Sequence, residues 1–296
     1  MIIESKGKIA DNIWALGEPA LPSYLLLGQS PVLFDAGMTF MGPRYLQDLK
    51  SILGDPSRIT HLFLTHSHFD HCGAAPFLKR NIPGLKIAAS KLAAEVWQRP
   101  QAIQFIRNLS KDMEEKFASL IKDYHVSFNG LEVDLILRDG QEVTLPDGTK
   151  IQAIATPGHT KDALSFYLPQ SKTLIAGETA GSLDRYYNIR PVFLSSYKDY
   201  VQSLEKLQGL DGQLLILGHF YSWRGNIKDF LMKARTATEE FAQRISRELA
   251  SSGGNQESVV RKIFQEDYQE KKLILQEERP FLINLAAQVK AIAEGR

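Results

Sequence analysis

Four residues that could bind metal ions lie close together in the stretch Ile59 to Pro76, which reads ITHLFLTHSHFDHCGAAP. They follow the short apolar run Leu62 to Leu64, and they are His66, His68, Asp70 and His71. Successive side chains of a strand alternate between its faces, so His66 and His68 are expected to point the same way. A turn after them directs Asp70 and His71 to a neighbouring point. One tight loop is therefore expected to supply ligands to two adjacent metal ions.

Imidazole and carboxylate ligands suit zinc, iron or manganese, and a site that keeps open coordination positions is catalytic rather than structural. Three of the seven histidines lie in this loop, and His159 and His219 follow in similar loop settings. A lone histidine at a strand end is more often a hydrogen-bonded structural residue. The density of ligand types here favours a metal site instead.

The stretch HSHFDH resembles the H-x-H-x-D-H signature of the metallo-β-lactamase superfamily. Four further motifs of that family follow its order, and they are PVLFDAG with Asp35, ATPGHT with His159, IAGET with Glu178 and LILGH with His219. The resemblance covers residues 8 to 225 and implies an α/β fold, the αββα sandwich of the family. Asp35 is either a turn cap or a support for the metal loop.

The resemblance also implies the ligand sets. His66, His68 and His159 would hold the first of two divalent transition-metal ions, Asp70, His71 and His219 the second, and Glu178 would bridge them. Zinc is the first expectation, with iron and manganese as alternatives. A hydroxide held between the ions would attack the substrate, and Asp70 is the catalytic candidate, orienting the water or passing a proton to the leaving group.

Glu178 departs from the family pattern, in which the fourth motif presents Asp. Its extra methylene adds roughly 1.5 Å of reach, so an unaltered backbone would push the carboxylate too far into the site. We expect the end of the preceding strand to shift back so that Glu178 bridges both metals. The alternatives are a carboxylate that binds one metal and one that turns aside to another partner.

The order of motifs, the length and the helical C-terminal part resemble the quinolone-signal response thioesterase subgroup. This resemblance implies hydrolysis of a small-molecule thioester or related ester. Lactonase and phosphodiesterase activities stay open, because the catalytic core is common to all of them. β-Lactam hydrolysis is not expected as the native activity.

Two hypotheses belong to other classes. One is a metal-binding regulator with little turnover, and it stays open because Glu178 replaces the Asp of the family pattern. A di-iron redox protein is disfavoured, because flavin-linked relatives carry Glu where this chain has His68 and are followed by a flavodoxin-like domain.

Composition bears on the partners and on the cellular compartment of the protein. The chain has 296 residues, a formal net charge of +1 and one cysteine, Cys72, for which a buried packing role is favoured over that of a ligand or nucleophile. The near-neutral charge gives no reason to expect nucleic acid as a partner. Without a disulfide, a signal-peptide core or a membrane-length apolar run, we expect a soluble cytoplasmic enzyme with no membrane partner.

The spacing of apolar residues predicts the strands and helices that position these residues. Strands are predicted over 2–4, 13–16, 23–27, 31–34, 62–64, 85–89, 133–137, 142–145, 150–155, 164–168, 173–176 and 214–217. Helices are predicted over 43–53, 73–80, 92–124 with a break near Pro100, 196–207, 227–250, 257–264 and 280–293. Two domains are expected: 1–225 carries the metals, and 226–296 is a helical extension.

The helical extension begins a few residues after His219, so we expect it to contribute a lid over the site. A packing extension and a homodimer surface are the alternatives. Residues that could line the entrance are Tyr186, Tyr187, Tyr221 and Arg224.

Overall fold

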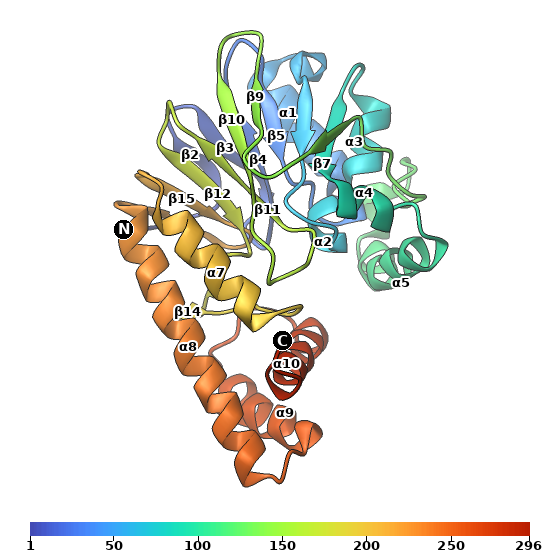
Figure 1. The fold of residues 1–296 in the computed structure, drawn as a ribbon. Helices are drawn as coiled ribbons and strands as arrows, with labels where there is room; N and C mark the ends of the chain where they lie inside the picture. The colour runs from blue at the N-terminus through green and yellow to red at the C-terminus, as the bar shows by residue number, and fades with distance from the viewer.

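Two β-sheets packed face to face form the centre of the computed structural model, which describes residues 1–296 (Figure 1). Each of the two large sheets has seven strands, and helices cover both outer faces. This αββα arrangement confirms the predicted fold class. No helix combines the length and the apolar composition that crossing a membrane requires.

The first sheet is built from strands that follow one another in the chain, in the order β2-β3-β4-β5-β6-β7-β8. Their bounds are β2 Gly7–Ala10, β3 Ile13–Glu18, β4 Leu21–Leu26, β5 Val32–Phe34, β6 His61–Phe63, β7 Lys86–Ser90 and β8 Leu135–Leu137. Strands β2 to β5 pair antiparallel, and β5 to β8 pair parallel. Strand β5 is buried throughout, which is why it reads as a continuous apolar run.

The second sheet has the order β1-β16-β15-β12-β11-β10-β9, with one parallel pair, β12 and β15. Its bounds are β1 Ile2–Glu4, β9 Glu142–Thr144, β10 Lys150–Ala155, β11 Leu164–Leu168, β12 Thr173–Gly177, β15 Leu214–Leu217 and β16 Tyr221–Arg224. The N-terminal strand β1 closes this sheet against β16, with Ile2 opposite Trp223. A separate hairpin consists of β13 Ser182–Leu183 and β14 Ile189–Arg190.

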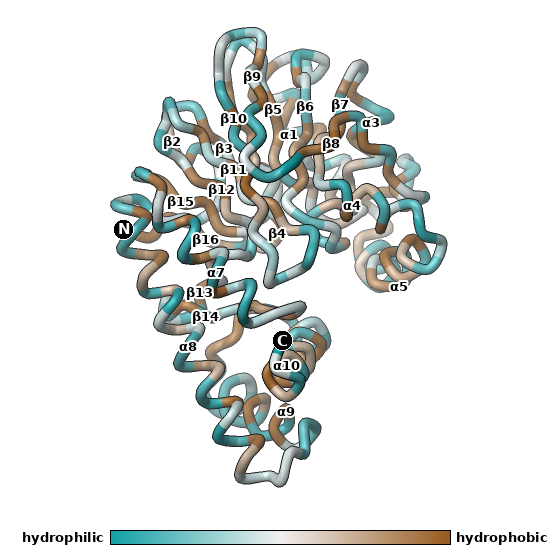
Figure 2. Tube along the Cα trace, viewed as in Figure 1, coloured by the Kyte–Doolittle hydropathy of each residue, from teal (hydrophilic) through white to brown (hydrophobic).

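Apolar side chains fill the space between the sheets. Phe34 and Phe63 from the first sheet and Phe166 from the second lie with ring centroids 5.4 to 5.5 Å apart. Figure 2 shows the apolar residues concentrated along the strands, while the outer helices alternate between apolar and polar residues. The sandwich therefore gives the loops at its edges a rigid base.

Helices α1 Gly42–Leu53, α2 Phe69–Cys72, α3 Ala75–Asn81, α4 Lys91–Val96, α5 Pro100–Lys116 and α6 Ala118–Ile121 lie on the side of the first sheet. Local sequence explains the ends of α1, where Pro43 occupies the first turn and Gly54 takes φ of 74° after the last. Trp97 is fully buried in this layer.

The second sheet is covered by α7 Tyr197–Gln208, α8 Ile227–Ser251, α9 Gln256–Phe264, a π-helix over Gln265–Glu270 and α10 Glu278–Ala293. The side chains of Ser196, Asn226 and Asn255 cap α7, α8 and α9 by accepting backbone N–H groups. One apolar cluster joins the second sheet to these helices, including Leu217 before residue 225 and Ile245 after it. The division at residue 225 stays a prediction.

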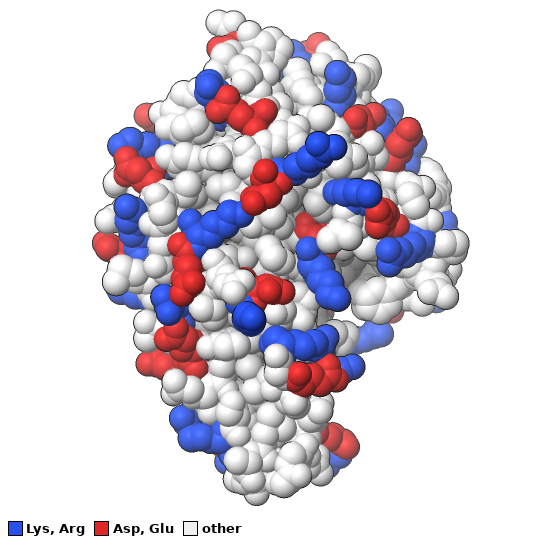
Figure 3. Space-filling model, in the orientation of Figure 1, with Lys and Arg blue, Asp and Glu red and all other residues white.

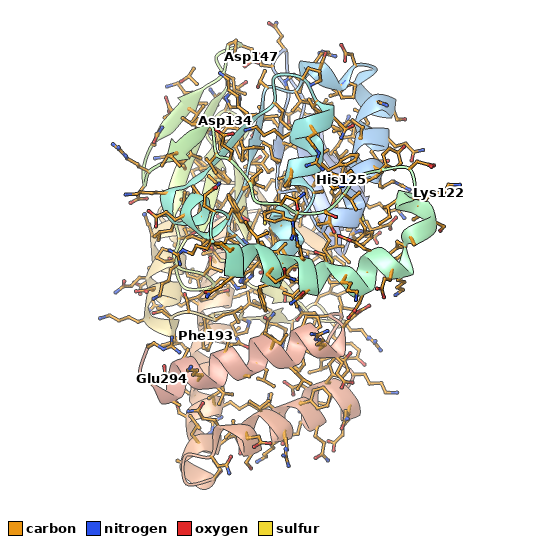
Figure 4. The ribbon with its side chains drawn as sticks, turned by 90° about the vertical axis from the view of Figure 1, so that its right-hand side faces the viewer. Lys122, His125, Asp134, Asp147, Phe193 and Glu294 are labelled. Carbon is orange, nitrogen blue, oxygen red and sulfur yellow. The ribbon has the colours of Figure 1, made fainter.

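Helix α10 approaches α5 across a gap, although the two helices are far apart along the chain (Figures 1 and 4). An ion pair between Asp112 and Arg279, 3.3 Å long, joins them. The C-terminal helices therefore approach both outer layers of the sandwich.

The structure corrects several details of the sequence-based elements. The short strands β2, β13, β14 and β16 were not predicted, because each has at most one buried residue and therefore no apolar run. Strand β6 ends at Phe63, so His66 and His68 lie in the loop beyond it rather than on a strand. The helix expected from Gly73 begins at Phe69 and breaks at Gly73, where a Cβ would lie 2.7 Å from the Thr39 nitrogen.

Candidate metal centre

Five of the seven histidines converge at one edge of the sandwich, together with Asp70 and Glu178. Two groups form there, and within each the potential ligand atoms lie within 4.8 Å of one another. The first group is His66, His68, His159 and Glu178, and the second is Asp70, His71 and His219. All seven residues singled out in the sequence are thus brought together, and their assignment as ligands stays a prediction.

Each of these side chains comes from the end of a regular element. His66 and His68 follow β6, and Asp70 and His71 lie on the single turn of α2. The other three follow β10, β12 and β15, and they are His159, Glu178 and His219. Strand ends held by a packed core fix such side chains more firmly than free loops do.

Hydrogen bonds set the orientation of four imidazoles. The Nδ1 atoms of His71, His159 and His219 lie 2.8, 2.6 and 2.6 Å from Asp35 Oδ2, Val192 O and Ala20 O. His66 Nδ1 lies 2.9 Å from Thr65 Oγ1, a hydroxyl that donates to Asp35. All four partners accept, so in its neutral form each of these rings carries its proton on Nδ1 and turns the Nε2 lone pair to the centre. His68 is reversed, and its Nδ1 lies 3.0 Å from His159 Nε2.

Asp35 supports the metal loop, one of the two roles left open by the sequence. Its carboxylate accepts from the backbone N–H of Thr65 at 2.8 Å and from His71 at 2.8 Å. Its φ of 56° lies in the left-handed region, which costs free energy and persists where surrounding contacts enforce it. Thr65 was missed in the sequence, although a hydroxyl residue directly before His66 is a usable signal.

The residues present fit a transition metal. His66 Nε2 is buried and has no hydrogen-bond partner. An orphaned buried nitrogen costs about 1–3 kcal/mol, which a metal bond would offset. Its neighbours offer only lone pairs of imidazole nitrogen and carboxylate oxygen, a donor set that zinc, iron and manganese accept.

Glu178 stands between the two groups. Its Oε2 lies 2.5 Å from His159 Nε2 and 3.6 Å from His66 Nε2, while its Oε1 lies 3.7 Å from His219 Nε2. The pairing of β12 with β15 slips between Ile175 and Gly177, immediately before Glu178. A bulge can re-aim the side chain that follows it, and the expected shift of this strand end stays a prediction.

Charge in the metal-free site is unevenly distributed. Burial and the neighbouring His159 lower the pKa of His68 to about 4. Burial would also lower the pKa of His71, but the Asp35 carboxylate outweighs it and raises that pKa to about 9. Burial opposes ionisation of Glu178, yet His159 and His66 hold the pKa of its carboxyl well below the usual range.

Metal affinity is expected to rise with pH between 6 and 9. The raised pKa of His71 means that a metal must displace a proton from it below about pH 9. Each displaced proton changes the apparent affinity about tenfold per pH unit. Chelator-competition titrations at several pH values check this, and Asp35→Asn should move the plateau to lower pH. A flat profile in the wild-type protein would contradict this account of His71.

One side of the site is open. The side chains of Asp70 and His219 are 18% and 13% exposed, against 1% for His66 and 2% for His71. Asp70 and His219 are therefore open to solvent, while His66 and His71 are not.

The remaining candidates lie elsewhere. His61 and His125 are not among the converging histidines, and Figure 4 marks His125 on the side of the first helical layer. Cys72 is buried, with its sulfur 3.5 Å from the Ser67 carbonyl oxygen, in agreement with the packing role favoured by the sequence.

The expected entrance residues divide into two kinds. Tyr186 and Tyr187 are exposed, and the ring of Tyr187 meets that of Tyr221 at 5.4 Å between centroids. Arg224 instead donates to the Ile9 carbonyl oxygen at 2.5 Å, which is a packing contact.

Comparison with known proteins places this geometry in a family. The model of the Metallo-beta-lactamase superfamily matches residues 20–219, a stretch that contains all seven converging residues. The chain is 28% identical over 199 residues to Beta-lactamase-like protein 2 homolog of Caenorhabditis elegans, covering 67% of this chain and 55% of that protein. It is 25% identical to the Atrochrysone carboxyl ACP thioesterase of Aspergillus fumigatus, covering 67% and 50%. The chain thus spans about half the length of these two relatives.

Solved structures agree on the fold. The metallo-beta-lactamase family protein TTHA1429 from Thermus thermophilus superposes with a TM-score of 0.66 and 21% identity, covering 97% of this chain and 95% of that one. Because the family model matches most of the chain, this protein belongs to the metallo-beta-lactamase superfamily.

Proposed function

We propose that this protein is a dinuclear metal-dependent hydrolase that cleaves a small-molecule thioester or a related ester. The observation that carries the proposal is the position of Glu178, whose Oε2 faces His66 and His159 while its Oε1 faces His219. One carboxylate thus connects the two groups of ligands, as a bridge between neighbouring ions requires.

The two groups of side chains support the ligand sets that the sequence predicts. His66, His68 and His159 would hold one ion, and Asp70, His71 and His219 the other. When bound, such ions lower the pKa of water and polarise a carbonyl oxygen. Zinc is our first candidate, with iron and manganese as alternatives.

The chain itself supplies the rest of the chemistry. Asp70 Oδ2 lies on the open side, 3.6 Å from His219 Nε2, where it can take a proton from the attacking water and return it to the leaving group. No serine or cysteine nucleophile is required, and the thiol of Cys72 is buried.

An uncharged acyl substrate is favoured over a phosphodiester. Lysine and arginine alternate with aspartate and glutamate over the face in Figure 3, with no separate basic patch there. The formal net charge of +1 agrees with this mixture. Phosphate binding normally relies on a basic surface. The thioesterase named among the relatives supports an acyl thioester as the first substrate to test.

The proposal is tested with the metal-loaded protein and a panel of thioesters, oxyesters, lactones and phosphodiesters of similar size. We expect the highest kcat/KM for a thioester. Asp70→Asn should retain metal, since its amide oxygen can still bind, while kcat falls about 10²- to 10⁴-fold because the amide cannot accept the proton.

Asp11→Asn is the matched control, because it makes the same change at a fully exposed carboxylate beside Lys8. Turnover of a lactone or phosphodiester in preference to every thioester would overturn the substrate class. Full metal loading with no turnover of any ester would favour a metal-binding regulator.

A further inference from the structure

The segment Arg190 to Val192 connects the metal centre to the C-terminal helices. On one side, the Val192 carbonyl oxygen accepts the Nδ1 proton of His159 at 2.6 Å. On the other side, Gln288 Nε2 of α10 donates to the Pro191 carbonyl oxygen at 2.8 Å. Two consecutive carbonyl groups of one short segment are therefore bound, one by a candidate ligand and one by the extension.

A buried carboxylate of the extension fixes the start of the same segment. Asp267 of the π-helix is 1% exposed, and its Oδ2 accepts from Arg190 at 2.6 Å and from Arg244 at 2.8 Å. Arg244 also reaches Glu266 at 2.8 Å. Buried ion pairs with several hydrogen bonds impose one geometry on their partners, because any displacement leaves a charge without compensation.

The residues directly after this segment bind the loop that carries His159. The backbone N–H groups of Leu194 and Ser195 donate to the Gly158 carbonyl oxygen at 3.1 and 3.0 Å. Phe193 is fully buried against Tyr200 and against Phe241 of α8. Figure 4 places Phe193 close to the C-terminal end of α10, which Glu294 marks.

We infer that Gln288 and Asp267 are positioning residues for His159, so that the C-terminal helices set the geometry of the first metal site. The inference rests on the proposed function only in taking His159 as a metal ligand. It gives the extension a role that differs from the expected lid. Asp267 and Gln288 hold Arg190 and Pro191, and the next residue, Val192, supplies the hydrogen-bond acceptor of His159.

The physical link is the position of one carbonyl oxygen. A carbonyl only accepts, so the Val192 oxygen keeps the His159 proton on Nδ1 and directs the Nε2 lone pair inward. If the segment moves, the ring either follows its acceptor or loses it. Both results would weaken the bond from His159 to a metal ion, while the other ligands stay in place.

Gln288→Met tests this link, because methionine keeps the length and the burial of the side chain but cannot donate to Pro191. We measure Zn²⁺ affinity by chelator competition and the electronic absorption of bound Co²⁺ in the full-length protein. The affinity at the site that contains His159 should fall about tenfold or more, the effect typical of lost partners of metal-binding histidines. The cobalt spectrum should change as well, which a purely structural weakening of α10 would not cause.

Arg190→Gln is a second variant that should fold readily, because Asp267 keeps its bond to Arg244. Lys262→Gln is its matched control, since it removes a cation from the Lys262–Glu248 pair of the same extension without touching the segment. Asn284→Leu serves the same purpose for Gln288, as Asn284 lies on α10 and contacts Gln276. Both controls should keep wild-type affinity and spectrum.

The outcomes distinguish failure of the positioning role from failure of the proposed function. If the wild-type protein binds Zn²⁺ but Gln288→Met and Arg190→Gln bind it with unchanged affinity and an unchanged cobalt spectrum, the positioning role is wrong and the proposed function stands. If equal losses occur in the variants and their controls, the extension acts only on stability, and the inference is again overturned. If the wild-type protein binds no metal, the proposed function fails and takes the inference with it.

Discussion

Replacing His66 with alanine is expected to empty the first metal site and reduce hydrolysis to background. His66 Nε2 is buried and lacks any hydrogen-bond partner within the protein, so a metal bond is the interaction for which it is placed. Deleting the ring removes one of three imidazoles from the group that includes His68 and His159. Elemental analysis of protein made in metal-rich medium, together with turnover of the best substrate, measures both effects.

Thermal unfolding with and without metal gives a second measurement for His66→Ala. A ligand that binds only the folded state at 1,000 times its Kd stabilises a protein by about 4 kcal/mol. The wild-type protein should gain such stability on adding metal, and the variant should lose the part that comes from the first site. Without metal the two should differ little, because the variant also removes an unsatisfied buried nitrogen.

His125→Ala is the control for this experiment. His125 is exposed on the first helical layer and lies outside the converging histidines (Figure 4). Its removal should leave metal content and turnover unchanged. A wild-type protein that holds no metal after growth in metal-rich medium would count against the whole interpretation of the site.

Replacing Glu178 is expected to have the second largest effect. Glu178→Gln keeps the shape of the side chain but removes the negative charge between the two groups of ligands. Since His159 and His66 hold the pKa of Glu178 well below its usual range against the effect of burial, the wild-type group is a carboxylate throughout the neutral range. Affinity at one or both metals should fall, and hydrolysis should fall with it.

Glu178→Asp separates charge from reach. Asp restores the charge but shortens the side chain, so on the same backbone its carboxylate would lie farther from the histidines that Glu178 faces. We expect metal binding to be partly retained, below that of the wild type and above that of Glu178→Gln. Metal content and competition affinity for both variants measure this order.

Glu114→Gln is the matched control, because Glu114 is half-buried and its Oε1 bonds Thr39 at 2.5 Å in a different part of the molecule. It should not change metal content. If Glu178→Gln also leaves metal stoichiometry and activity untouched, Glu178 is not a ligand, and a mechanism with two bridged metals must be redrawn.

Local patterns account for the parts of the fold that the sequence predicted well. The runs ending at Phe34, Phe63 and Leu217 are apolar because the strands are buried, and a buried strand leaves that signal in its own residues. The amphipathic repeats of α8 and α10 likewise follow from packing one face of a helix. Short strands with a single buried residue, such as β13 and β16, leave no comparable apolar run.

The sequence by itself also determined which residues form the candidate site. Five of the seven histidines follow predicted strands, so His66, His159 and His219 stand out by type and by place. Their chemistry belongs to the side chains, and it can be recognised without knowing where the chain folds.

Only the tertiary structure decided how these side chains are held. The acceptors that fix His159 and His219 are the carbonyl oxygens of Val192 and Ala20, and every residue carries such a group. The link from Gln288 to Pro191 spans 97 positions along the chain. Backbone acceptors and contacts over such separations leave no pattern in the order of residues, because they arise from the packing of distant elements. The candidate ligands can therefore be identified from the sequence, whereas their orientation depends on the folded chain.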